Sequence, residues 1–350
     1  MLKIFAKVLA WLCGIYAALV VLVVLYDAVI FKDRNIDFYQ DYRSGIFAHV
    51  NHLAVYGLNK VRLHDRQILL MGASVVGRGF IADDLANSLG EGAHVHKLAM
   101  AGANISMHEE LLHDLAAKQD FTKPQSLTVI IPVHFKAMLD DARKYPSGRT
   151  HLGTEKLRHK IWSQDGVGEI VPRFPPAIHT PLYSYLIQPF VRIYGVKSLA
   201  HEGAYELKKV VIDRINETAG RQVASINLTD DQYMARTLES FGGEGYTDEQ
   251  FKKLAALSIW LQELGAQVII LDLPTQTIYR EGFPLYHEYR EKLRAHLPAD
   301  AIYIDMSAFA EDAEFEDDIH ALPEFMPNWT EELARALAEQ KPFKQAPTAQ

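Results

Sequence analysis

Residues 67–80 read Gln-Ile-Leu-Leu-Met-Gly-Ala-Ser-Val-Val-Gly-Arg-Gly-Phe. A short apolar run that ends at a glycine is typical of a buried strand. Ser74 comes just after this run, and open α/β sheets bind their ligands beyond the carboxyl ends of their strands. Ser74 is therefore a candidate nucleophile, and the rest of the chain must supply a base, an orienting acid and an oxyanion site.

The chain around this stretch alternates apolar runs with segments of helical periodicity. We expect strands at residues 68–71, 94–100, 127–133, 267–273 and 301–306. We expect helices at residues 82–88, 106–118, 248–264, 286–296 and 330–340, with Gly265 as a C-cap and Asn328 or Thr330 as an N-cap. This alternation predicts an α/β fold, a flavodoxin-like three-layer structure around a mainly parallel sheet.

The amino-terminal residues predict membrane attachment. Residues 8–26 carry no charge, and a run of this length crosses a hydrocarbon core of about 30 Å. Lys3 and Lys7 precede the run, so the positive-inside rule places the N-terminus in the cytoplasm and the following domain outside it, in the periplasm or at the cell surface. We predict a single-pass signal anchor over residues 1–34 in the cell membrane; a cleaved signal peptide is the alternative.

The remaining domain boundaries follow from changes in pattern. A juxtamembrane connector is expected over residues 35–66, where apolar spacings favour amphipathic helices. The α/β domain is expected over residues 67–340, and a flexible tail over residues 341–350. An insertion over residues 135–245, with helices near 204–217 and 230–241, interrupts the domain. This insertion serves as a lid, groove or docking surface, or it only covers a sheet edge.

Composition excludes several functional classes. The net charge of −8 and the lack of a Lys/Arg-rich block argue against a nucleic-acid partner. The single cysteine, Cys13, excludes an intramolecular disulfide. His94 and His96 share one face of a strand but lack further ligands, so we expect core or edge histidines and no metal site. His108 and His113 are expected at the surface of a helix.

Loops after several strands should converge on Ser74, because parallel strands bring their carboxyl ends to one edge. Asp317, Asp318 and His320 follow the fifth strand. A serine hydroxyl becomes a good nucleophile when an imidazole takes its proton and a carboxylate orients that imidazole. We therefore assign Ser74 as nucleophile and His320 as base, with Asp317 as the acid and Asp318 as the alternative acid.

This order of motifs resembles the SGNH (GDSL-like) hydrolase family. The matching residues are Gly72-Ala73-Ser74, Gly102 after the second strand, and Asp317-Asp318-Ile319-His320 before the last helix. The resemblance implies a Ser-His-Asp triad, an oxyanion hole that includes the backbone N–H groups of Ser74 and Gly102, and no cofactor.

One block departs from the family. Where SGNH proteins carry Gly-x-Asn-Asp after the third strand, this chain has Pro132-Val133-His134-Phe135, so the oxyanion asparagine is absent. Asn104 or His134 is the candidate substitute. Arg78, in Gly77-Arg78-Gly79, is a candidate contact for an anionic substrate.

The anchor, the altered block and the insertion make the chain similar to the membrane-anchored SGNH branch that includes DltD and the alginate O-acetylation proteins. This likeness implies a serine O-acyltransferase or esterase that acts on a cell-envelope polysaccharide or teichoic-acid-like polymer, beside a membrane-bound O-acyltransferase partner. One alternative is a non-catalytic accessory protein of the same fold that docks on such an acyltransferase. Another is a flavodoxin-like module that binds a nucleotide or phosphate.

Overall fold

A computed structural model provides the structure of the chain. It describes residues 2–30, 35–37, 61–100, 102–139, 163–164, 168–169, 230–240 and 245–340. The predicted helix near 204–217 and the predicted tail over 341–350 lie outside these residues, as do most of the predicted connector and insertion. The chain divides into two compact units, one with the amino-terminal helix and one with the sheet.

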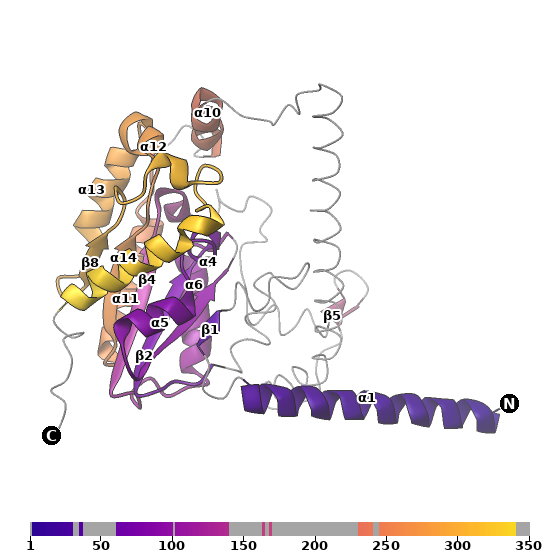
Figure 1. Cartoon of the computed structure of the whole chain (residues 1–350). Coiled ribbons are helices and arrows are strands. Elements are labelled where there is room, and N and C mark those ends of the chain that lie inside the picture. The colour runs from indigo at the N-terminus through magenta and orange to yellow at the C-terminus, as the bar shows by residue number, and fades with distance from the viewer. Residues whose placement is uncertain are drawn as a thin grey trace, which may run out of the picture. The chain divides into compact units, whose positions relative to one another are not determined.

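The central feature is a parallel sheet, whose strands lie among the helices in Figure 1. It has six strands in the order β1-β3-β2-β4-β7-β8, all of them parallel. Its strands are β1 (Ile36–Asp37), β2 (Arg66–Gly72), β3 (Ala93–Ala99), β4 (Ser126–Val133), β7 (Gln267–Asp272) and β8 (Ile302–Asp305). The five longer strands have the order 2-1-3-4-5, which is that of doubly wound flavodoxin-like sheets. The predicted parallel α/β architecture is confirmed, and each of the five predicted strands is present.

Helices cover both faces of this sheet. Side chains from α5 (Ala82–Leu89) and α14 (Met326–Glu339) share one buried cluster with alternate strand residues such as Ile68 and Leu70. The intervening residues, such as Leu69, are buried on the other face. There α6 (Ile105–Ala116) packs beside α11 (Glu249–Glu263), which in turn contacts α13 (Tyr286–His296).

The end of α11 agrees with the sequence prediction. Gly265 has a φ of +86°, and its N–H donates to the carbonyl of Gln262, while the N–H of Ala266 donates to that of Leu261. This is a Schellman arrangement, which glycine favours because it has no Cβ to clash in the left-handed region.

The predicted start of the last helix is wrong. α14 begins at Met326, with Phe325 as its N-cap and Pro327 in its first turn, where the missing proline N–H costs no helical bond. Asn328 and Thr330 therefore lie inside the helix. The Thr330 hydroxyl donates to the carbonyl of Met326 and accepts the N–H of Ile81, which ties α14 to the segment before α5.

Several short elements were not predicted. They are β1, the one-turn α4 (Ser74–Gly77), α12 (Thr277–Gly282), the 3-10 turns η3 (Phe135–Met138), η4 (Asp312–Glu314) and η5 (Pro323–Phe325), and the paired strands β5 (Ser163–Gln164) and β6 (Gly168–Glu169). The predicted helix near 230–241 is present as α10 (Asp230–Ser240).

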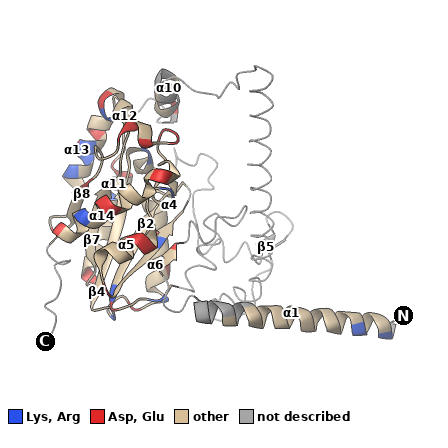
Figure 2. Ribbon diagram, viewed as in Figure 1, with Lys and Arg blue, Asp and Glu red and all other residues tan. Residues whose placement is uncertain are grey.

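The amino-terminal helix α1 (Leu2–Ile30) is long and apolar enough to span a membrane or to act as a signal anchor. Its lysines lie near the N-terminal end (Figure 2), and large apolar side chains such as Phe5, Trp11 and Leu22 are exposed along it. The helix begins before the uncharged run and continues past its end, so the expected apolar segment is helical throughout.

Candidate active site

The strand-to-helix turn after β2 presents Ser74 at the carboxyl edge of the sheet. Ser74 is the first residue of α4, whose backbone is closed by bonds from the N–H of Gly77 to the carbonyl of Ala73 and from Arg78 to Ser74. A Cβ at Gly72 would lie 2.4 Å from Cβ of Val76, so this turn requires glycine at position 72. Because Ser74 begins a helix, its N–H has no acceptor within that helix.

Three predicted residues form one hydrogen-bonded chain. Nε2 of His320 lies 2.8 Å from Oγ of Ser74, and Nδ1 of His320 lies 2.7 Å from Oδ2 of Asp317. Asp317 accepts the Nδ1 proton, so Nε2 of the neutral ring is left to accept the serine proton. The structure thus brings together residues that are 246 positions apart.

The two adjacent acids, Asp317 and Asp318, differ in their contacts. Oδ1 of Asp317 accepts the backbone N–H groups of Ile319 and His320 at 3.0 and 2.8 Å. Burial raises the pKa of Asp317, but the bonds from the His320 ring and these two N–H groups outweigh it and hold the pKa at about 2. Asp318 instead pairs with Lys136 and accepts the hydroxyl of Tyr279 at 3.2 Å.

The loop that carries Asp317 and His320 is held by ion pairs on two sides. Glu316 forms an ion pair of 3.0 Å with Arg78, the C-cap of the Ser74 turn. Asp318 pairs with Lys136 of η3. Each of the three consecutive acids at 316–318 thus has a different cationic or imidazole partner. Arg78 lies beside the site as expected, and its position holds the loop; a contact with substrate stays a prediction.

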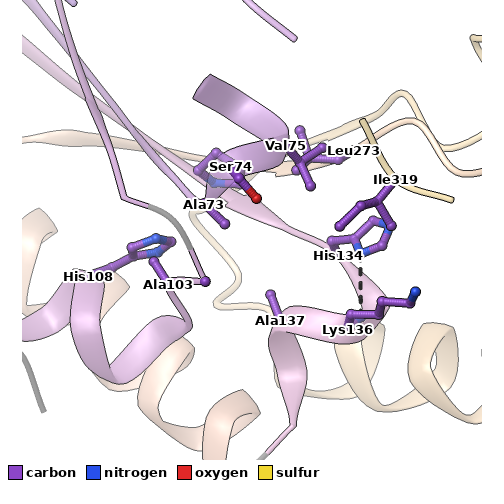
Figure 3. A pocket seen from close by; sticks show the side chains of 12 residues that line it. Ala73, Ser74, Val75, Ala103, His108, His134, Lys136, Ala137, Leu273 and Ile319 are labelled. Atoms are coloured by element: carbon purple, nitrogen blue, oxygen red, sulfur yellow. Dashed lines mark hydrogen bonds between the residues drawn. The ribbon is translucent and has the colours of Figure 1, made fainter. Parts of the chain in front are cut away.

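A pocket of about 70 Å³ opens beside Ser74 (Figure 3). Its wall is largely apolar, and its polar lining side chains are Ser74, His108, His134 and Lys136. Typical sites for whole drug-sized ligands have about 300–1,000 Å³. The described pocket therefore suits the reacting end of a substrate rather than an entire nucleotide.

A search of protein-family models finds no match to the chain, and neither does a search of curated proteins.

The candidate oxyanion donors lie at different places. Gly102, which has a φ of +73° and lies between β3 and α6, lines the pocket. His134, which follows β4, also lines it. Nδ1 of His134 accepts the N–H of Lys136 at 3.4 Å (Figure 3), which leaves the proton of the neutral ring on Nε2. Asn104 is the N-cap of α6 and accepts the N–H of Met107, and it is not part of the described pocket lining. The geometry favours His134 over Asn104.

Two pocket residues were missed from the sequence. His108 was expected at the surface but is 1% exposed, while His113 is exposed as predicted. His108 precedes Leu111, Leu112 and Leu115 at helical spacing, and this apolar stripe was the available signal. Lys136 lies two residues after His134, and nothing in the local pattern distinguishes it from a solvated lysine.

His94 and His96 are not among the residues that line this pocket. His96 is buried and bonds to the carbonyl of Arg62 and the N–H of Ile36 through its two ring nitrogens. Burial lowers its pKa to about 4. His94 stacks on His64 at 3.7 Å between ring centroids. Among the described residues no cluster of His, Cys, Asp and Glu suits a metal ion.

Proposed function

We propose that the chain is a membrane-anchored, extracytoplasmic serine O-acyltransferase or esterase of the SGNH type. The observation that carries this proposal is the hydrogen-bonded chain Ser74–His320–Asp317 beside a small, largely apolar pocket. The proposal is also supported by the Gly-bearing turn after β3 and the Asp-x-x-His loop before α14, the motifs on which the resemblance to SGNH hydrolases rests. The proposed substrate is an acyl ester of a cell-envelope polysaccharide or a teichoic-acid-like polymer.

The first half of the reaction follows from the three side chains. Oγ of Ser74 attacks the ester carbonyl carbon while Nε2 of His320 takes the hydroxyl proton. The tetrahedral intermediate then expels the alcohol, which receives that proton from His320, and the acyl group remains on Ser74. Asp317 holds the ring in the reactive tautomer and stabilises the imidazolium.

The second half transfers the acyl group. A water molecule or an acceptor hydroxyl gives its proton to His320 and attacks the acyl-enzyme, and Ser74 regains its proton as the product leaves. The backbone N–H groups of Ser74 and Gly102 and Nε2–H of His134 supply the oxyanion donors. In this proposal a histidine replaces the asparagine of the family's third block.

The test is covalent labelling of the full chain in detergent or membranes with a fluorophosphonate probe. We expect labelling of the wild type, loss of labelling in Ser74→Ala, and wild-type labelling in Ser88→Ala, which changes an exposed serine of α5. Hydrolysis of a small acetyl ester should follow the same order. Equal labelling of Ser74→Ala and the wild type would contradict the assignment of the nucleophile.

A fully folded wild type that neither labels nor hydrolyses the ester would point instead to the accessory protein that docks on a membrane-bound acyltransferase. The observation that favours this second function is the altered third block, Pro132-Val133-His134-Phe135.

A further inference from the structure

Lys97 is a fully buried cation that the proposed reaction does not use. It lies within β3, and its side chain has 0% exposure. An ammonium group inside a protein is unfavourable unless acceptors or an opposite charge replace its water shell. An apolar residue at this strand position would pack without that cost. The contacts of Lys97 therefore indicate what the charge achieves.

The ammonium group lies at the end of the turn that carries Ser74. Nζ of Lys97 donates to the carbonyl of Gly77 at 3.0 Å and to that of Phe80 at 2.6 Å. Gly77 is the last residue of α4, and Ser74 is its first. A cation is favourable at the carboxyl end of a helical turn, where carbonyl groups lack intrahelical partners. Lys97 thus fixes the turn from the end opposite to the nucleophile.

The counter-ion comes from the segment that follows the apolar helix. Oδ2 of Asp37 lies 2.7 Å from Nζ of Lys97, and Asp37 pairs with Lys97 in the register of β1 and β3. Asn35 accepts the backbone N–H of Val95 at 2.8 Å, and Ile36 is buried at 1% exposure. Only residues 31–34 separate the end of α1 from Asn35 in the sequence.

We propose that Asp37 and Lys97 are positioning residues for Ser74, and that strand β1 completes the support of the nucleophile. This inference rests on the proposed function. Removing the carboxylate takes the Asp37 charge away from the buried ammonium, which makes its burial less favourable and weakens its hold on Gly77 and Phe80. A displacement of about 1 Å at a reacting group costs about 10²-fold in rate, so a loosened turn slows acylation.

The test compares Asp37→Asn with the wild type in the full chain. Asn keeps the volume of Asp37 and removes its charge, and Lys97→Met is the matching change on β3. Both variants are assayed well below their unfolding midpoints for fluorophosphonate labelling of Ser74, with the maximal labelling rate separated from the probe affinity. We expect the maximal rate to fall about 10- to 100-fold with little change in probe affinity, and Asp37→Glu to recover part of the loss.

Arg290→Met is the matched control, because it removes another poorly exposed cation from a carboxylate pair, at Asp272. We expect it to lower stability and to leave the labelling rate of the folded protein unchanged. A folded Asp37→Asn that labels at the wild-type rate overturns the inference, and so does an equal loss in Arg290→Met. An unlabelled wild type overturns the proposed function itself, and the inference with it. If Lys97→Met does not fold, the comparison of Asp37→Asn with Asp37→Glu decides.

Discussion

Two polar clusters lie near the carboxyl ends of the strands, and each contains an aspartate whose pKa is shifted. In the triad cluster (Ser74, Asp317, His320), the side chain of Asp317 is 37% exposed. In the Asp272 cluster, the side chain of Asp272 is 1% exposed and contacts one guanidinium group and two phenol hydroxyls. Its members are Asp272, Tyr289, Arg290, Tyr303 and Asp305.

The two aspartates differ in which physical effect sets their pKa. Burial raises the pKa of Asp272 to about 6, against the opposing charge of Arg290. At Asp317, hydrogen bonds outweigh burial and lower the pKa. Imidazole is the side-chain type suited to general-base catalysis near neutral pH, whereas guanidinium and phenol groups are not. A buried polar network is therefore insufficient evidence of an active site; a nucleophile, a neutral-range base and a pocket must coincide.

The largest effect should separate neighbouring acids inside the triad cluster. We expect Asp317→Asn to lower kcat by about 10³–10⁴-fold, because an amide cannot hold the reactive tautomer of His320. Asp318→Asn, which alters only the pair with Lys136 and Tyr279, should lower kcat far less. Ester hydrolysis by the two purified variants makes the comparison. A larger loss in Asp318→Asn would reassign the acid.

Substitutions in the Asp272 cluster should instead lower the free energy of unfolding. Arg290→Met leaves a buried carboxylate without its cation, and breaking such a pair costs about 3–5 kcal/mol of unfolding free energy. Denaturant unfolding measures this cost, and labelling of Ser74 in the folded fraction should stay at the wild-type rate. A large loss of labelling without a loss of stability would show that the two clusters are coupled.

Substitution of His134 should lower the reaction rate, as substitution of Asp317 does. We expect His134→Leu to lower kcat by about 10²–10³-fold with little change in KM, as for the loss of one oxyanion donor. His134→Asn restores a donor of the kind found in the SGNH third block and should recover much of the rate. Equal rates in both variants would exclude the proposed donor role.

The smallest expected effect is on how the unfolding free energy changes with pH, and it has opposite signs at Asp317 and Asp272. Asp317 has a lowered pKa, so its ionised carboxylate stabilises the folded state above about pH 4. This stabilisation is lost as pH falls through about 2. Asp272 has a raised pKa, so its protonated carboxyl stabilises the folded state below about pH 4. This stabilisation is lost as pH rises through about 6.

The unfolding free energy of the wild type, relative to Asp317→Asn, should therefore shrink toward low pH. Relative to Asp272→Asn, it should shrink toward neutral pH. Parallel curves for either pair would contradict the assigned shift.

The longer elements could be predicted from sequence because their signals are local. Apolar runs rich in β-branched residues identify β4 and β7, and glycine identifies the end of α11. In contrast, β1 consists of Ile36 and Asp37, which become a strand only through pairing with β3. The formation of β1 depends on contacts between segments that are distant in the sequence. The periodicity of a sequence does not report such contacts.

The candidate site divides in the same way. Ser74, Asp317 and His320 could be selected because topology brings the ends of parallel strands together. Selecting Asp317 over Asp318 needs the shape of the loop, since Asp317 accepts the N–H groups two and three residues ahead. The pairing of Lys136 with Asp318 joins η3 to that loop and has no counterpart in local sequence.

The Asp-x-x-His loop is closed by its own backbone. The N–H of Glu316 donates to the carbonyl of His320, and that of Leu322 donates to that of Glu314, both at 2.8 Å. The amide hydrogens of Ile319 and His320 are held by the carboxylate that orients the base. Their exchange with deuterium requires the loop to open, so both should exchange together, at a rate set by that opening. In the resting protein, the protection of two amides should therefore measure the fraction of molecules whose base and acid are in place.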